Sequence, residues 1–396
     1  MAFLGEAVRA YRTKLMHELM DRENWDALVF TRGDFFQFAT NFSMDVETWE
    51  RPIACVIPRN GEPFAILNEL STNNWRYAAG DGRLWVSDAS FYSEHPRQEH
   101  RLPLTGDWAP MLAEKLKQAG LGRSRIGTDD ASGPLEAAIR LLPGAELVAA
   151  GAETRRLRWV KHPDEIALMR EIAAVADWLQ ERYRENIRPG RLSMELDWAM
   201  GALFAEEAAR RFPDQDVQLD SVWLLSGPSS AAPHGDGRRS SARIEKGHVI
   251  VNMVIPRING LVVENERTWF CGRPDAQQER LFEAARAANE AGLEAAVAGQ
   301  PVSGIDAAAQ AVIEKAGFGE YINHRTGHGM GLICHEYPED MAFNSRALLA
   351  NEVYSVEPGI YVHGLGGFRH DDTVVIGPTP EVLTRTAKDL KSQTIL

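Results

Sequence analysis

Short apolar runs alternate with amphipathic stretches through the first part of the chain. The runs ALVFT (27–31) and PIACVIP (52–58) have the length and the β-branched content of buried strands. The stretch WAPMLAEKLKQAG (108–120) instead carries apolar residues at helical spacing. This alternation predicts a small α/β domain over residues 1–155.

A long amphipathic segment at 157–183 predicts the opening helix of a second domain, over residues 156–396. Pro163, Asp164 and Glu165 favour a helix start, because proline presets φ and acidic side chains complement the helix dipole. Helical and β-rich stretches then follow one another, at 192–211, 247–256, 260–271, 275–298, 303–317, 351–362 and 368–377. We therefore expect an α/β (α+β) protein whose second domain packs outer helices on a curved antiparallel sheet.

The composition of the chain excludes some classes of binding partner. Its 396 residues include 43 basic and 56 acidic side chains, and the net charge of −13 opposes binding to nucleic acid or to an anionic membrane surface. Its three cysteines lack CxxC spacing, which argues against a disulfide framework or a zinc ribbon. No apolar run reaches about 18 residues, and charges interrupt the N-terminal segment, so neither a membrane span nor an export signal is expected. We expect a cytoplasmic protein with a small-molecule substrate.

Candidate chemistry gathers in three segments of the second half. His328 lies among three glycines, which permit close backbone approach around an imidazole. Glu357 ends an apolar run and precedes Pro-Gly, a turn signal that places its carboxylate at a strand end. Asp371 begins another run, where alternation puts it on the same face as Arg369 and opposite His370. These side chains are expected to meet in one cleft.

Four segments together resemble the aminopeptidase P, prolidase and creatinase superfamily: GHVIVNMVIPRINGLVVENERTWF, TGHGMGLICHEYP, YSVEPGIYV and GGFRHDDTVVI. The resemblance covers the C-terminal half of the chain and implies a pita-bread fold. Metallopeptidases of this superfamily bind two divalent ions through two aspartates, one histidine and two glutamates. The residues matched to these ligands are Asn252, Glu264, His328, Glu357 and Asp371.

The matched ligand set departs from the metallopeptidase pattern most strongly at its first position, since Glu264 and Asp371 keep the charge and change the reach by only one methylene. A neutral Asn252 supplies one oxygen and no charge, so a dinuclear site would lose a strong ligand for a hard cation. We therefore expect a site without a metal or any other cofactor. The alternative is a site with one or two Mn, Zn or Fe ions held by Glu264, His328, Glu357 and Asp371.

Creatinase, the metal-free branch of the superfamily, supplies further matches. They place Glu266 and Glu357 on two glutamates that bind a guanidinium through charge-assisted hydrogen bonds, and His234 on the catalytic histidine. On this resemblance His234 moves a proton from water to the leaving nitrogen, and His328 relays protons or supports the tetrahedral intermediate. Arg51 matches an arginine that reaches the substrate carboxylate in the other subunit, which implies a homodimer with shared sites.

The expected function is hydrolysis of a C–N bond in a small zwitterion, either a creatine-like guanidino carboxylate or an ectoine-like amidino carboxylate. The predicted catalytic residues are His234, Glu266, His328 and Glu357. The predicted substrate-binding residues are Arg51, Asn252, Glu264, His335 and Asp371, with His363 as a secondary candidate.

Three other functions remain open. An Xaa-Pro metallopeptidase with an altered metal site would need a metal ion, so chelation and metal analysis discriminate it from a metal-free hydrolase. A lyase acting on dimethylsulfoniopropionate would bind a similar small cation joined to a carboxylate. A non-catalytic pita-bread module would bind a partner and turn over no substrate.

Overall fold

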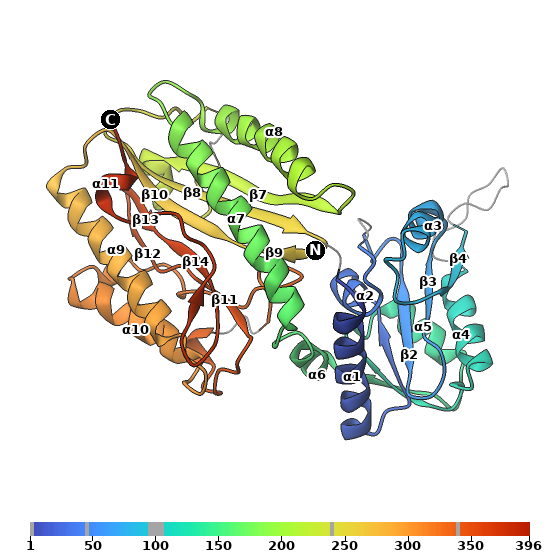
Figure 1. The fold of residues 1–396 in the computed structure, drawn as a ribbon. Coiled ribbons are helices and arrows are strands. Elements are labelled where there is room, and N and C mark those ends of the chain that lie inside the picture. The colour runs from blue at the N-terminus through green and yellow to red at the C-terminus, as the bar shows by residue number, and fades with distance from the viewer. Residues whose placement is uncertain (1–3, 44–46, 94–106, 238–240, 338–340) are drawn as a thin grey trace. The chain divides into compact units, whose positions relative to one another are not determined.

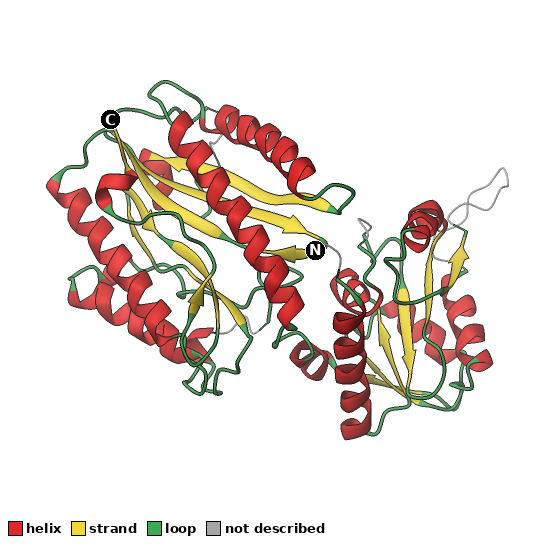
Figure 2. Cartoon of the chain, viewed as in Figure 1, coloured by secondary structure: helices red, strands yellow, loops and turns green. Residues whose placement is uncertain are grey.

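The structure, a computed structural model, describes residues 4–43, 47–93, 107–237, 241–337 and 341–396. The contacts between Cα atoms divide the chain into two compact units, with the boundary between Arg158 and Trp159 (Figures 1 and 2). That these units are independent domains, expected over residues 1–155 and 156–396, remains a proposal. Separate expression of the two parts would test it.

The first unit contains a six-stranded mixed sheet in the order β4-β3-β2-β1-β5-β6. Its strands are β1 (Ala27–Phe30), β2 (Ala54–Pro58), β3 (Phe64–Asn68), β4 (Asp88–Tyr92), β5 (Arg125–Thr128) and β6 (Glu146–Ala149). Its helices are α1 (Glu6–Glu23), α2 (Gly33–Thr40), α3 (Thr72–Gly80), α4 (Trp108–Gln118), α5 (Gly133–Arg140) and α6 (Gly151–Arg156), with a 3₁₀ turn, η1 (Glu69–Ser71). The expected strands at 27–31 and 52–58 and the expected helix at 108–120 are confirmed.

The second unit contains a larger sheet with the main order β11-β14-β10-β8-β7, to which β9, β15 and β16 add short pairings. Its strands are β7 (Val217–Ser226), β8 (Val249–Ile258), β9 (Leu261–Val262), β10 (Asn265–Cys271), β11 (Val353–Val356), β14 (Asp371–Val375), β15 (Glu381–Val382) and β16 (Thr394–Ile395). A separate two-stranded sheet pairs β12 (Gly359–Val362) with β13 (Gly366–Arg369). The main pairings are antiparallel, as predicted.

Helices cover the larger sheet in the second unit (Figure 1). They are α7 (Pro163–Asn186), α8 (Ser193–Arg211), α9 (Ala276–Ala295), α10 (Ser303–Lys315) and α11 (Leu390–Gln393), with 3₁₀ turns η2 (Gly227–Ala231), η3 (Gly319–Tyr321) and η4 (Met341–Phe343). The predicted helix start at Pro163 is confirmed, and His162 and Glu165 form a capping box there that the sequence analysis missed. Within the described residues, no helix has both the length and the apolar character needed to cross a bilayer.

The alternation of side chains along β8 and β10 separates two faces of this sheet. The strand register pairs Met253 with Glu266 and Asn252 with Arg267. On the Asn252 face, Gln180 of α7 donates a hydrogen bond to the backbone oxygen of Asn252 at 3.3 Å, so this face is covered by a helix. On the opposite face, Met253 and Glu266 border a cavity.

Candidate active site

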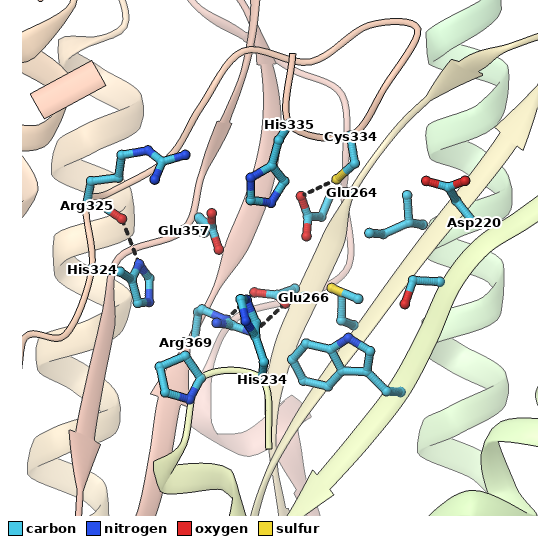
Figure 3. Close-up of a pocket in the computed structure, with 15 residues that line it drawn as sticks. Asp220, His234, Glu264, Glu266, His324, Arg325, Cys334, His335, Glu357 and Arg369 are labelled. Atoms are coloured by element: carbon cyan, nitrogen blue, oxygen red, sulfur yellow. Dashed lines mark hydrogen bonds and ion pairs between the residues drawn. The ribbon is translucent and has the colours of Figure 1, made fainter. Parts of the chain in front are cut away.

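The uncovered face of the second unit's sheet bears a cavity of about 360 Å³. Strands β7, β8 and β10 supply its floor, while the loop before β11 and the ends of β11 and β13 supply polar walls (Figure 3). The cavity is lined by Asp220, Ser221, Trp223, Pro233, His234, Met253, Ile255, Glu264, Glu266, His324, Arg325, Cys334, His335, Glu357 and Arg369. Its volume lies within the range of small-molecule sites.

An imidazole and two carboxylates converge beside this cavity, where Glu264 and Glu357 belong to the lining and His328 is buried behind them. His328 Nε2 lies 3.4 Å from Glu357 Oε1 and 3.6 Å from Glu264 Oε2. His328 Nδ1 lies 2.9 Å from the carbonyl oxygen of Gly329, which can only accept, so Nδ1 carries a proton and Nε2 faces the two carboxylates. Burial lowers the pKa of His328, but the neighbouring Glu357 outweighs it and the pKa is raised overall. A histidine held in this way through its other nitrogen is typical of a metal ligand.

A third carboxylate, that of Asp371, belongs to the same cage. Ser355 Oγ donates to Asp371 Oδ1 at 3.0 Å, and the strand register sets Asp371 opposite Glu266. The pKa of Asp371 is held well above its usual value, mainly by burial and to a smaller extent by repulsion from Glu357 and Glu266. Burial, followed by repulsion from Asp371 and Glu357, likewise raises the pKa of Glu264.

These four side chains, Glu264, His328, Glu357 and Asp371, have the donor chemistry of a divalent metal site. Within the described residues, His328 Nε2 and Asp371 Oδ2 are buried without a hydrogen-bond partner. Buried polar atoms normally have partners, and a cation among the carboxylates would supply one and relieve their mutual repulsion. Carboxylate oxygens and an imidazole suit Mn, Zn or Fe. The donor types present therefore suit one such ion, and His328, Cys334 and His335 offer a second set of donors, with ligand atoms within 4.8 Å of one another.

The glycines around His328 are needed for backbone contact, as the sequence analysis expected. A Cβ atom on Gly327 would lie 2.0 Å from the backbone oxygen of Ser355, and one on Gly329 would lie 2.6 Å from that of Tyr337. Real Cβ atoms do not approach backbone oxygens this closely. The two glycines let the His328 segment pack directly against its neighbours and fix the imidazole in the cage.

Asn252 does not lie in the cage, contrary to our expectation. Strand β8 presents Met253 and Ile255 to the cavity, so alternation turns Asn252 to the opposite face, where its Nδ2 donates to the backbone oxygen of Trp223 at 3.0 Å. Met253 is the β8 residue directly opposite Glu266. The position nearest the cage on this strand therefore carries a thioether, which is a poor ligand for a hard cation.

The Asn259-Gly260 pair could have revealed this register. Both residues have positive φ, 48° and 86°, and Ile258 pairs with Leu261 across them. Such a pair signals a two-residue hairpin, which fixes every residue opposite its partner along both strands. Counting outward from this turn sets Met253, rather than Asn252, on the Glu266 face.

Glu266 already has a cationic partner in the chain, so it does not form the open cradle expected with Glu357. Arg369 Nη2 donates to Glu266 Oε1 at 2.6 Å, and Arg369 Nε contacts the other carboxylate oxygen. Both side chains are almost completely buried. Burial raises the pKa of Glu266 to about 7, against the lowering effect of Arg369. The internal arginine takes the place that we had assigned to a substrate guanidinium.

A short hydrogen-bond chain extends from this ion pair to a histidine that the sequence analysis did not select. Arg369 Nη1 donates to the Tyr361 hydroxyl at 3.0 Å, and that hydroxyl lies 2.7 Å from His324 Nε2. His324 Nδ1 lies 2.7 Å from the carbonyl oxygen of Arg325, so Nδ1 carries the proton and Tyr361 donates to Nε2. The predicted shared face of Arg369 and Asp371 is confirmed, because both belong to this site.

Two predicted histidines lie at the cavity wall. His234 is exposed and follows η2, and His335 stacks on His328 with ring centroids 4.0 Å apart (Figure 3). The pKa of His335 is lowered to about 4, mainly by partial burial and to a smaller extent by the charge of the neighbouring His328. His363 is exposed and is not among the lining residues.

Arg51 belongs to the first unit, where its Nη1 lies 2.8 Å from Glu50 Oε2. Its predicted contact with the site of a second subunit, and the homodimer that this contact implies, both stay predictions. Sequence spacing gives no signal for contacts between chains.

Comparison with known proteins places the chain in a family. The profile of metallopeptidase family M24 matches residues 167–378, which is more than half of the chain. The chain therefore belongs to metallopeptidase family M24 and has the pita-bread fold. This confirms the superfamily and the fold class that we predicted.

Individual relatives are peptidases by name. The chain is 28% identical to the putative dipeptidase YkvY of Bacillus subtilis, over 92% of this chain and 94% of the relative. It is 31% identical to the probable dipeptidase PepE of Mycobacterium bovis, over 83% of this chain and 82% of the relative. The prolidase structure from Thermococcus sibiricus superposes with a TM-score of 0.80 at 25% identity, covering 96% of this chain and 98% of that one.

The expectation of a site without a metal is wrong. Members of family M24 and the prolidases are metalloenzymes that need a divalent metal, and the cage described above has the donors to hold one. Our expectation rested on the loss of one ligand on strand β8, but the remaining cage still provides an imidazole and three carboxylates. The expected amidinohydrolase activity receives no support from these relatives.

Proposed function

We propose that the protein is a metal-dependent dipeptidase. The observation that carries this proposal is the buried cage of Glu264, His328, Glu357 and Asp371, two of whose carboxylates line a cavity of about 360 Å³. The names of the relatives, which are dipeptidases and a prolidase, support a short peptide as the substrate. The proposal includes proline in the second position as one of the substrates to be tested.

The four cage residues would hold one divalent cation. When bound, such an ion lowers the pKa of water and polarises the scissile carbonyl as a Lewis acid. The chain contributes the fixed orientation of the ligands, because Gly329 holds the His328 ring and Ser355 holds Asp371.

The other polar groups of the cavity bind the substrate and move protons. Arg325 lines the wall and can orient the free carboxylate of a dipeptide through its planar fork. His234 can accept a proton from water and return it to the leaving nitrogen, the role that we predicted for it. Arg369, paired with Glu266 and Tyr361, keeps that wall of the cavity rigid.

Chelation is expected to abolish dipeptide cleavage, because the three buried carboxylates would be left with their mutual repulsion and without the Lewis acid. The measurement is the hydrolysis of Leu-Pro and Leu-Ala before and after dialysis against EDTA, with Mn, Zn, Fe or Co added back. Elemental analysis of the untagged protein should give about one metal ion per chain, since the cage has ligands for one. Full activity in metal-free protein would contradict the proposal.

The same assay includes creatine and ectoine as substrates, since the sequence predicted a guanidino or amidino carboxylate. The pairing of Glu266 with Arg369 disfavours these cations, because a substrate guanidinium would have to displace a buried arginine. Hydrolysis of creatine or ectoine without cleavage of any dipeptide would overturn the dipeptidase proposal in favour of the amidinohydrolase. Lyase activity on dimethylsulfoniopropionate is measured separately as the release of volatile dimethyl sulfide.

Restoring a carboxylate on β8 is expected to create a second metal site only at the cavity-facing position. Met253→Asp should raise the metal content from about one ion per chain to about two, because an aspartate there would join the cage carboxylates. Asn252→Asp is the matched control and should leave the content unchanged, since Asn252 faces α7. A second ion in Asn252→Asp but not in Met253→Asp would refute the register argument.

A further inference from the structure

Strand β7 has an irregularity at the wall of the cavity. Its pairing with β8 shifts register between Leu219 and Ser221, which leaves Asp220 as the extra residue. Neighbouring residues of a regular strand point to opposite faces, but Asp220 and Ser221 both line the cavity. Bulges of this kind re-aim side chains and are common beside active sites. The bulge thus adds a carboxylate to the cavity that a regular strand would have excluded.

The cavity is charged differently at its two sides. Figure 3 shows Arg325 on one side and Asp220 on the other, with the cage residues Glu357 and Glu264 between them. The floor towards Asp220 is formed mainly by the apolar side chains of Trp223, Met253 and Ile255. A group that reaches Asp220 from the cage therefore crosses an apolar surface before it meets a negative charge.

This arrangement matches an amphipathic cationic side chain. Lysine and arginine lay their methylene stems along apolar surface and keep the charged end at a polar group. The free amine of a dipeptide is too close to the scissile bond to span that floor, because only one carbon separates it from the reacting carbonyl. The side chain of the amino-terminal residue is the part that can extend to Asp220.

The present contact of Asp220 with Arg257 is weak enough for a substrate cation to replace it. Arg257 Nη1 is 3.7 Å from Asp220 Oδ1, which is longer than a hydrogen bond, and the Asp220 side chain is 34% exposed. A partly solvated pair of this kind contributes little, so a better-placed cation can replace it at small cost. An ion pair made with hydrogen bonds inside the cavity would be the stronger interaction.

We propose that Asp220 makes this site selective for substrates whose amino-terminal residue is lysine or arginine. The side chain would lie over Trp223 and Met253 with its cation at Asp220, while Arg325 receives the free carboxylate at the other side. The proposal rests on the proposed dipeptidase function and names the substrate class of that site. It also gives Met253 a role, since a residue that is a poor ligand for a hard cation provides the apolar floor.

The test compares Lys-Pro with norleucine-Pro, which shares the aliphatic stem and lacks the charge. The metal-loaded wild-type protein should cleave Lys-Pro with a kcat/KM about tenfold to hundredfold higher, the range expected for a hydrogen bond to a charged group. Asp220→Asn should bring the ratio close to one. Asp216→Asn removes an equal charge just before β7, outside the lining residues, and should leave the ratio at its wild-type value.

A binding measurement separates this inference from the dipeptidase proposal. Calorimetry on the metal-loaded protein should show tighter binding of L-lysine than of L-norleucine, and Asp220→Asn should remove the difference. Cleavage of both dipeptides at equal rates, or an unchanged ratio in Asp220→Asn, would overturn the assignment of Asp220 and leave the dipeptidase proposal standing. Preferred binding of lysine without cleavage of any dipeptide would support the assignment of Asp220 and contradict the dipeptidase proposal.

Discussion

Replacing His328 by alanine is expected to remove the metal ion and lower kcat/KM for dipeptides by about a thousandfold. His328 is the imidazole of the cage, and its Nε2 faces Glu357 and Glu264 with no hydrogen-bond partner within the described residues. A catalytic metal supplies several kcal/mol of transition-state stabilisation, and each 1.4 kcal/mol or so corresponds to a factor of ten in rate. Metal content by elemental analysis and steady-state kinetics check the two effects together.

The control for this substitution is His363→Ala, because His363 is exposed and lies outside the cavity lining. It should retain metal and activity. Thermal unfolding monitored by tryptophan fluorescence should show that both variants fold. A His328→Ala variant that keeps its metal and cleaves dipeptides at the wild-type rate would exclude His328 from the cage.

Replacing Arg267 by leucine is expected to destabilise the second unit by about 3 kcal/mol, because several buried oxygens lose their donor while Lys388 still pairs with Asp372 at 2.6 Å. Arg267 and Asp372 are both completely buried, and Arg267 Nη2 donates to Asp372 Oδ1 at 2.8 Å. Arg267 also donates to the backbone oxygens of Asp371 and Thr386, so it joins β10 to β14 and to the C-terminal segment. Urea unfolding of the full chain measures the loss.

Arg170→Leu is the matched control for that measurement. Arg170 pairs with Glu381 at 2.7 Å, but both side chains are more than 40% exposed, and surface pairs contribute about 0–1 kcal/mol. Equal losses in the two variants would show that burial of the Arg267 pair has no special weight. An intermediate loss in Arg267→Lys would assign part of the effect to the planar fork of arginine, which a lysine cannot reproduce.

The residues of these two predictions lie on opposite faces of the sheet. Arg267 and Asp372 lie on the face that α7 covers, where their charges stabilise the packing. Glu266 and Asp371, each one residue away in sequence, lie on the cavity face with the cage. Substitutions at neighbouring positions of β10 or β14 are therefore expected to have different effects. Those on the covered face lower stability, and those on the cavity face lower catalysis.

The sequence motifs are sufficient to identify most of the cage. They select Glu264, His328, Glu357 and Asp371, of which Glu264 and Glu357 line the cavity beside His328 and Asp371 is buried against Ser355. Close backbone packing around His328 is also predictable, because glycine is the residue that permits it. Such features follow from local chemistry, which short stretches of sequence contain.

The wrong predictions all concern contacts that depend on register or on distant residues. Asn252 and Met253 are neighbours in sequence, and only the hairpin at Asn259-Gly260 decides which one faces the cage. Glu266 could be recognised as a candidate, but its partner Arg369 lies more than 100 residues further along the chain. Motif matching assigned to Glu266 a substrate cation that the fold supplies internally.

By itself, the sequence determined the fold class, several of the strands and helices, the family and four candidate metal ligands, although it predicted a site without a metal. These properties depend on periodicity, on glycine conformations and on donor type, all of which are local. The tertiary structure decided that Met253 and not Asn252 faces the cage, that Arg369 neutralises Glu266 and that the bulge turns Asp220 into the cavity. A side chain in a strand changes face with each step, so its partners are fixed only when the strands pair and the sheet closes over its core.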